Sequence, residues 1–249
     1  MCPETEARSA RHLQSGQDCF RPDSVLTALS FTYVIPDIHG RSDLLRDGLA
    51  GIVAHAAGRP GTIVALGDYV NKGADSKAVV DILKAGPVPG WAFFPLKGNH
   101  DAMMVEALRN PARMRWWLDR GGDATLASYG GDASQVPSDH IAWLYGLALM
   151  HSDRQRIYVH AGLDPNVPLD RQSERTLLSK RYPQGYASAF GGRHVVHGHD
   201  SLVDGPKLYE GRTNLDTRAW RTGRLMIGVF DDDVPGGPIG FIRTQGSPG

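Results

Sequence analysis

Three features are scarce or missing in this sequence, and each argues against a class of protein. Only two of the 249 residues are cysteines, Cys2 and Cys19, so we expect no disulfide framework and a reducing, cytoplasmic setting. The 27 basic and 27 acidic residues give a formal net charge of zero, which argues against nucleic acid or a membrane surface as partner. No apolar run reaches membrane-spanning length, and residues 1–18 do not have the pattern of a secretory signal.

What is present is the composition of an ordinary globular protein, with 41% hydrophobic and 22% charged residues. A chain of this length can bury a large core. We expect an N-terminal extension at residues 1–28, one catalytic domain at residues 29–243, and a loose tail at residues 244–249.

Apolar runs alternate with amphipathic segments along the first half of the chain. The runs at residues 31–35, 62–66 and 92–96 predict strands, and helices are predicted between and after them at residues 42–57, 74–84 and 103–108. This alternation is typical of βαβ units and a mostly parallel sheet. Further helices are predicted at residues 113–118, 141–149 and 171–180. Further strands are predicted at residues 156–160, 193–199, 208–209, 213–216, 224–230 and 239–243.

Five of the predicted strands end at side chains that can ligate a metal. They are Asp37 and His39, Asp68, Asn99 and His100, His160, and His199. Because the carboxyl ends of parallel strands meet at one edge of a sheet, we expect these groups to converge. A set of carboxylate, amide and imidazole without cysteine suits manganese, iron or zinc. The set exceeds the needs of one metal, so we predict two divalent metals that share Asp68.

The motifs around these residues resemble those of the bacterial PPP-type metallophosphoesterases, the calcineurin-like serine/threonine protein phosphatases. The family pattern is GDxHG, GDxxDRG, GNHE or GNHD, HAG, and GH. This sequence has PDIHG at 36–40, GDYVNKG at 67–73, GNHD at 98–101, HAG at 160–162 and HGH at 197–199. The resemblance covers about residues 31–231. It implies an α/β fold in which two mixed β-sheets pack face to face between helical layers (α/β/β/α).

The resemblance also implies a role for each matching position. Asp37 and His39 would hold one metal and Asp68 would bridge, with manganese expected and iron or zinc as alternatives. The other metal would be held by Asn99, His160 and His199. A hydroxide on the metals would attack phosphorus in line, and His100 would protonate the leaving-group oxygen. Lys72 and Arg181 would bind the phosphate, although Arg181 also fits a solvated surface charge.

Three positions depart from the family pattern. Pro36 replaces a glycine in a turn. Asn71 replaces the aspartate that partners the catalytic histidine; its amide can accept a hydrogen bond from His100 but supplies no charge. Lys72 replaces an arginine and should act as a point charge, because lysine lacks the planar two-pronged group. His197 could compete with His199 as a ligand, and the family pattern favours His199.

The function that the sequence favours is a metal-dependent phosphoester hydrolase of the serine/threonine protein phosphatase type. The alternative is a dinucleoside polyphosphate hydrolase, which shares the same metal motifs. A third possibility, given Asn71 and Lys72, is a pseudoenzyme that binds phosphorylated partners without turnover. The expected substrate is a phosphoprotein or a small phosphoester, with no nucleic acid or membrane as partner.

Overall fold

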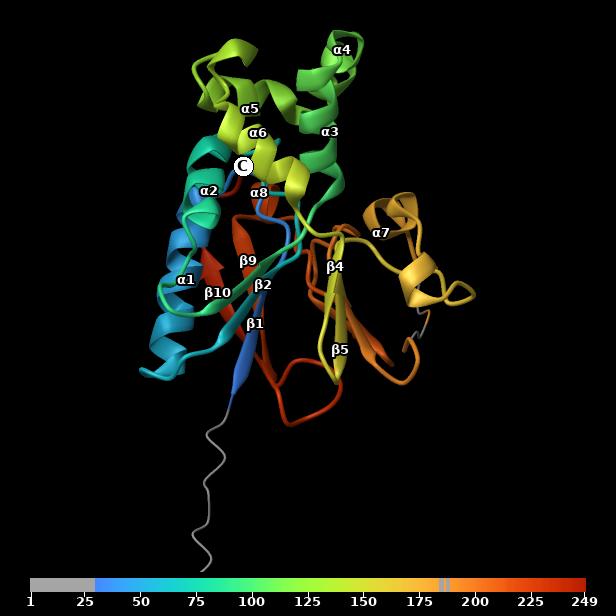
Figure 1. The fold of residues 1–249 in the computed structure, drawn as a ribbon. Coiled ribbons are helices and arrows are strands. Elements are labelled where there is room, and N and C mark those ends of the chain that lie inside the picture. The colour runs from blue at the N-terminus through green and yellow to red at the C-terminus, as the bar shows by residue number, and fades with distance from the viewer. Residues whose placement is uncertain (1–29, 184–185, 187–188) are drawn as a thin grey trace, which may run out of the picture.

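The computed structural model describes residues 30–249 apart from 184–185 and 187–188, so the expected extension at residues 1–28 lies outside it. Two five-stranded sheets form its centre (Figure 1). The first has the strand order β10-β9-β1-β2-β3, and the second has the order β4-β5-β6-β8-β7. Among the described residues, no helix combines the length and the apolar character needed to cross a membrane.

The first sheet contains the first three strands of the described residues. The parallel strands are β1 (Phe31–Ile35), β2 (Thr62–Ala65) and β3 (Ala92–Pro95). The helices α1 (Ser42–Ala56) and α2 (Ser76–Lys84) make the crossovers that parallel strands require. The antiparallel strands are β9 (Arg224–Asp231) and β10 (Gly240–Gln245). The expected domain boundary at residue 243 therefore falls inside β10.

The second sheet is also mixed. Its members are β4 (Met150–Ser152), β5 (Arg156–Val159), β6 (His194–His197), β7 (Lys207–Tyr209) and β8 (Arg212–Asn214). Strands β5, β6 and β8 are parallel, and β4 and β7 are antiparallel to their neighbours. We predicted a helix over residues 141–149, but the helix found there, α6 (Ser138–Gly146), ends three residues earlier. Strand β4 follows it and was not predicted. The apolar run after Gly146 has no periodicity that separates strand from helix.

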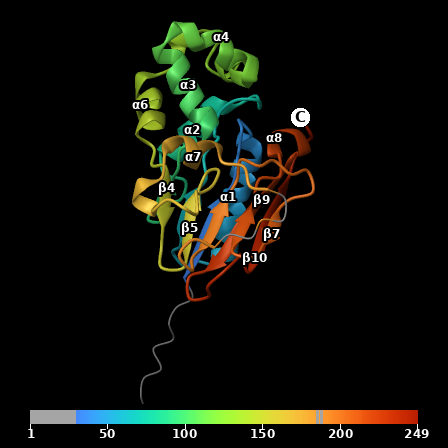
Figure 2. The same cartoon turned by 90° about the vertical axis from the view of Figure 1, so that its right-hand side faces the viewer.

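Apolar side chains of both sheets meet between them. The fully buried set is Val34, Val64, Leu66, Leu96, Tyr158, Val196, Leu215 and Phe230. Figures 1 and 2 show α1 on the outer side of the first sheet and α7 (Glu174–Ser179) on the side of the second. The two mixed sheets between helical layers confirm the fold that the sequence predicts.

The remaining helices lie beyond the carboxyl ends of β1, β2 and β3. They are α3 (Asn99–Arg109), α4 (Met114–Trp117), α5 (Asp123–Ser128), α6, and α8 (Ala219–Thr222). Trp117 on α4 is completely buried against them. These helices surround the strand ends where the sequence places its metal-ligating residues (Figure 1).

Candidate metal centre and active site

The strand ends surround a cavity of about 380 Å³. Its lining residues are Asp37, His39, Asp68, Lys72, Asn99, His100, Arg181, His199, Ser201, Arg218 and Trp220. Eight of the ten predicted site residues are in this set. The other two contact it directly, because His160 Nε2 lies 2.9 Å from Asn99 Oδ1 and Asn71 Nδ2 lies 2.7 Å from His100 Nδ1. The structure therefore brings all ten predicted residues together.

Close backbone approaches position the two aspartates. A Cβ atom on Gly98 would lie 2.1 Å from the backbone nitrogen of Asp68, and one on Gly198 would lie 2.0 Å from Asp37 Oδ1. Only glycine can occupy either position without moving a carboxylate. The glycines of the GNHD and HGH motifs are thus required by the packing of neighbouring loops.

Asp101 joins the loop after β2 to the loop after β3. Its buried carboxylate accepts hydrogen bonds from the backbone N–H groups of Gly98, Asp68 and Tyr69, at 2.9, 2.8 and 2.9 Å. Both loops carry metal-ligating candidates, so Asp101 fixes their relative positions without lining the cavity.

We expect Asp101→Asn to lower the free energy of unfolding by about 1–3 kcal/mol, because its amide N–H₂ would face a backbone donor in a buried site. Urea denaturation measures this loss. The control is Asp119→Asn, which removes one member of an exposed pair with Arg115 and should change stability by less than about 0.5 kcal/mol. Equal stability losses in the two variants would show that Asp101 does not join the loops.

Two histidines present lone pairs to oxygen atoms. His39 Nδ1–H donates to the carbonyl of Val70 at 2.9 Å, and His160 Nδ1–H donates to the carbonyl of Leu66 at 3.0 Å. In the tautomer that these hydrogen bonds select, Nε2 carries the lone pair, and the two Nε2 atoms lie 3.4 and 3.5 Å from the two carboxylate oxygens of Asp68. Acceptor atoms this close to one another favour a cation between them.

Two groups of three residues could each hold a metal ion. The first is His39, Asp68 and His100, and the second is Asp68, His160 and His199; ligand atoms within each group lie within 4.8 Å of one another. Asp68 belongs to both groups. In the second group, Asn99 Oδ1 lies 2.9 Å from His160 Nε2 and from His199 Nδ1. The side chains thus fit two divalent cations that share Asp68.

Asp37 lies at the edge of this arrangement. It belongs to neither group of three, and its carboxylate accepts a hydrogen bond from the backbone N–H of His199 at 3.2 Å. Burial, with the neighbouring carboxylates of Asp216 and Asp68, raises its pKa well above the ordinary value. A cation nearby would relieve this repulsion, so Asp37 fits the outer part of a metal site.

His197 is held away from the cation groups. Its Nε2 accepts a hydrogen bond from Arg212 Nη1 at 3.0 Å, and burial lowers its pKa to about 3. His199 instead lies next to Asn99 and within the second group. This geometry favours His199 as the ligand, as the sequence motif does.

Asn71 contacts His100 in the opposite sense from our expectation. Trp117 Nε1–H, which can only donate, lies 2.9 Å from Asn71 Oδ1, and Thr125 Oγ1–H donates to the same oxygen at 3.1 Å. The amide nitrogen must therefore face His100, so Asn71 Nδ2–H donates to His100 Nδ1 at 2.7 Å. The expected acceptor at this position is a donor. It leaves the ring proton on Nε2 and disfavours the imidazolium. His100 therefore presents a donor to the cavity, and His39 and Asp68 are the members of the first group that offer lone pairs to a cation.

The two predicted phosphate-binding cations differ in their surroundings. Lys72 Nζ lies 3.2 Å from His39 Nε2, inside the cavity. Arg181 Nη1 lies 2.5 Å from Asp200 Oδ1, and 65% of the Arg181 side chain is exposed. Arg181 lines the cavity, but its charge is already paired with a carboxylate.

The sequence did not lead us to four residues at this site. Asp216 follows the buried Leu215 and could have been found by the strand-end rule that identified Asp68. Its carboxylate accepts hydrogen bonds from Ser201 Oγ at 2.6 Å and from the backbone N–H of Arg218 at 2.7 Å. The other three, Ser201, Arg218 and Trp220, line the cavity and follow no sequence pattern.

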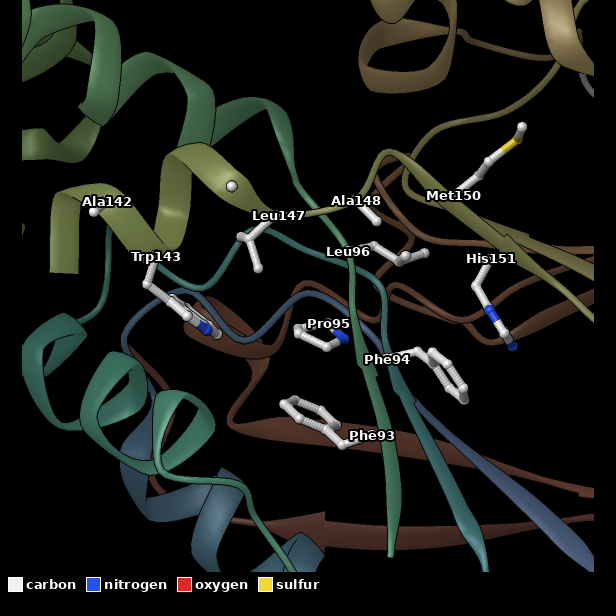
Figure 3. A pocket seen from close by; sticks show the side chains of 11 residues that line it. Phe93, Phe94, Pro95, Leu96, Ala142, Trp143, Leu147, Ala148, Met150 and His151 are labelled. Carbon is white, nitrogen blue, oxygen red and sulfur yellow. The ribbon is translucent and has the colours of Figure 1, made fainter. Parts of the chain in front are cut away.

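A second cavity, of about 390 Å³, lies between β3 and the segment that joins α6 to β4 (Figure 3). Its walls are mostly apolar, and they include Phe93, Phe94, Trp143 and Leu147. Its single titratable residue, His151, stacks on Phe94 with ring centroids 3.7 Å apart. This cavity offers no set of acid, base or metal-ligating groups, so we place the chemistry in the first one.

A sandwich of two mixed sheets, with imidazole, carboxylate and amide groups at its strand ends, is the arrangement of a metal-dependent phosphoester hydrolase. The family described as calcineurin-like phosphoesterase matches residues 32–224. The chain belongs to this family and is a hydrolase. The divalent metals that the family uses agree with the two cation-binding groups described above.

Relatives with different printed activities are similar to this chain. The symmetrical bis(5'-nucleosyl)-tetraphosphatase of Dechloromonas aromatica (strain RCB) is 30% identical over 146 residues, 57% of this chain and 48% of that protein. Serine/threonine-protein phosphatase 2 of Escherichia coli (strain K12) is 33% identical over 91 residues, 36% of this chain and 38% of that protein. The chain thus spans less than half the length of these curated relatives.

Solved structures match over more of the chain. The structure of "a putative diadenosine tetraphosphatase" has 26% identity and a TM-score of 0.65, covering 90% of this chain and 96% of that one. A metallophosphoesterase from Sphaerobacter thermophilus has 18% identity and a TM-score of 0.55, covering 88% of this chain and 89% of that one. The second match bears on the fold alone.

Proposed function

We propose that this phosphoesterase cleaves phosphoanhydride bonds, with dinucleoside polyphosphates as its substrate class. The observation that carries the proposal is the orientation of Asn71, whose amide N–H₂ faces His100 Nδ1. A neutral His100 with its proton on Nε2 can donate a hydrogen bond but is a poor acid. The site therefore suits leaving groups that depart without being protonated.

The two candidate substrates differ most in their leaving groups. A nucleotide leaves a phosphoanhydride as a phosphate oxygen, whose conjugate acid has a pKa of about 6. Serine leaves a phosphoester as an alkoxide, which is about as basic as hydroxide and therefore a much poorer leaving group. General acid catalysis contributes roughly 10²–10⁴-fold where a proton is needed, so its loss affects phosphoserine far more.

Each residue of the cavity has a separate role in the proposed hydrolysis. Bound divalent cations would polarise the phosphoryl group and make a water molecule more acidic. Lys72 places a positive charge beside the phosphoryl oxygens, and His100 Nε2–H donates a hydrogen bond to the leaving oxygen. The water oxygen ends on the attacked phosphorus, and the bond from that phosphorus to the leaving oxygen breaks. The proposed metal ligands are Asp37, His39, Asp68, Asn99, His160 and His199.

The similarity to a diadenosine tetraphosphatase structure over most of the chain supports this assignment. The shorter match to a serine/threonine-protein phosphatase supports phosphoprotein as the second candidate, which the sequence favoured. Manganese remains our proposed metal, because the ligand set combines imidazole, carboxylate and amide. The small number of cysteines keeps a cytoplasmic setting part of the proposal.

The experiment that tests this function compares kcat/KM for diadenosine tetraphosphate and for a phosphoserine peptide, with manganese present. We expect the tetraphosphate to be preferred by about 100-fold or more, the scale of a general acid contribution. A preference for the peptide would favour the protein phosphatase. Absence of turnover on both substrates and on p-nitrophenyl phosphate, with metal bound, would favour a pseudoenzyme.

We expect Lys72→Ala to lower kcat/KM by roughly 10–100-fold, the effect of losing a charge-assisted contact of about 1.5–3 kcal/mol. Lys72→Arg should retain most activity, because the positive charge remains. Arg181→Ala is the comparison and should stay within about threefold of wild type, since Asp200 already pairs with Arg181. Steady-state kinetics measure kcat/KM for each variant. A larger loss of kcat/KM in Arg181→Ala than in Lys72→Ala would make Arg181, and not Lys72, the main phosphate-binding cation.

A further inference from the structure

Left-handed backbone conformations concentrate at the active site. Seven non-glycine residues among those described have φ between 47° and 74°. One of them, Ala57, ends α1, where this conformation is common. The other six are His39, Asp68, Asn71, Lys72, His199 and Arg218. Such conformations cost free energy, and they persist where the surrounding structure requires them, most often at functional sites.

Arg218 is the one member of this set that neither belongs to the proposed metal ligands nor contacts His100 or His39. It has φ 57° and ψ 48° and directly precedes α8. Its backbone N–H donates to Asp216 Oδ1 at 2.7 Å, and its carbonyl accepts from the N–H of Arg221 at 2.9 Å. Asp216 is only 1% exposed and is bonded in turn to Ser201. A buried carboxylate thus fixes the strained backbone from which the Arg218 side chain reaches the cavity wall.

One indole ring holds two cations at the cavity. The Trp220 ring centroid lies 5.4 Å from Lys72 Nζ and 5.4 Å from Arg218 Cζ. Both distances allow a cation–π interaction, which positions each side chain without neutralising its charge. Lys72, Arg218 and Trp220 all line the same cavity, so its wall presents two neighbouring positive charges.

The positive charge of Arg218 is available to bind an anionic group, whereas that of Arg181 is already paired with a carboxylate. Arg181 is paired with Asp200. Within the described part of the chain, no ion pair includes Arg218. An arginine held in a strained conformation beside a site for phosphate chemistry, without a carboxylate partner, is suited to an anionic group of the substrate.

We propose that Arg218 binds a second phosphate group of the substrate, adjacent to the phosphoryl group that is attacked. This proposal rests on the proposed function and specifies how the site would select linked phosphates. Lys72 lies beside His39 and serves the attacked phosphoryl group as a point charge, whereas the planar guanidinium of Arg218 can bind a phosphate through two parallel hydrogen bonds. A phosphoserine peptide, with a single phosphate, would leave Arg218 without this contact.

The test measures dissociation constants by isothermal titration calorimetry on manganese-loaded protein, with imidodiphosphate and inorganic phosphate as probes and manganese matched in both solutions. The variant is Arg218→Gly, because glycine adopts positive φ readily and only the side chain is lost. We expect the Kd for imidodiphosphate to rise about 10-fold or more and the Kd for phosphate to rise less than threefold. The control Arg221→Ala removes an exposed arginine of α8 outside the cavity wall and should change neither.

Thermal unfolding supplies a second readout. Arg218→Gly should melt at a higher temperature than wild type, because the strain is relieved, whereas Arg218→Ala should not. The proposal is overturned if Arg218→Gly changes both dissociation constants equally or changes neither. Because the probes are bound and not hydrolysed, selective loss of imidodiphosphate binding would support Arg218 even in a protein that fails to cleave diadenosine tetraphosphate. If the wild-type protein cleaves diadenosine tetraphosphate but Arg218→Gly does not selectively lose imidodiphosphate binding, the proposed function stands and the role of Arg218 is rejected.

Discussion

Purified Asp68→Asn should contain fewer than two metal ions per chain and should lose on the order of 10³-fold or more in kcat/KM. Asp68 is the one residue shared by both cation-binding groups. Its buried carboxylate lies 3.4 Å from His39 Nε2 and 3.5 Å from His160 Nε2, so it faces one ligand atom of each group. An amide offers one oxygen and no charge, and a catalytic metal supplies several kcal/mol of transition-state stabilisation.

Elemental analysis and kinetics on the same preparation measure the two effects together. The control is Asp47→Asn, which removes an exposed carboxylate on α1 away from the cavity and should keep both metals and full activity. Far-UV circular dichroism checks that Asp68→Asn is folded. Two metals per chain and undiminished turnover in Asp68→Asn would rule out the shared carboxylate.

Asn71→Asp should raise turnover of a phosphoserine peptide by about 10–100-fold, part of the range of general acid catalysis, and should raise that of p-nitrophenyl phosphate much less. In the native site, burial lowers the pKa of His100 to about 4, and the facing amide N–H₂ adds no acceptor for a proton on Nδ1. An aspartate could keep one oxygen toward Trp117 and Thr125 and turn the other toward His100. The carboxylate would favour the imidazolium and raise the pKa of His100.

The direction in which Asn71→Asp shifts the pH–rate profile follows from the general acid role that the carboxylate would give His100. A general acid acts while it is protonated, so a higher pKa of His100 moves the alkaline limb of kcat/KM to higher pH. Paired pH–rate profiles of wild type and Asn71→Asp on the peptide measure this shift, with metal content checked alongside. Superimposable alkaline limbs at unchanged metal content would mean that residue 71 does not tune the acid.

The candidate metal-ligating residues could be predicted from the sequence as a group because each follows a local rule. Asp37, Asp68 and Asn99 follow apolar strands and precede a glycine turn or a helix, and a mostly parallel sheet brings such ends together. The glycines beside them are forced by close backbone approach, so they recur as short motifs. Strand β4 was missed because the apolar run after Gly146 has no distinguishing period.

Other parts of the site depend on distant contacts that no local pattern contains. The orientation of the Asn71 amide is set by Trp117 and Thr125, which are 46 and 54 residues further along the chain. The place of Arg218 depends on a buried carboxylate and on the ring of Trp220. The sequence therefore predicts which atoms can bind metal, whereas substrate preference depends on side-chain orientations that only the folded chain fixes.

The preference for weakly basic leaving groups is tested most directly by kcat/KM of the wild-type enzyme on a series of aryl and alkyl phosphates. The measured quantity is the slope of log kcat/KM against the pKa of the leaving group. If the facing amide keeps His100 from donating a proton, the slope is steeply negative, and it becomes shallower in Asn71→Asp. A flat slope in the wild-type enzyme would show that the leaving oxygen is protonated, and it would contradict the assignment of phosphoanhydrides as the substrate class.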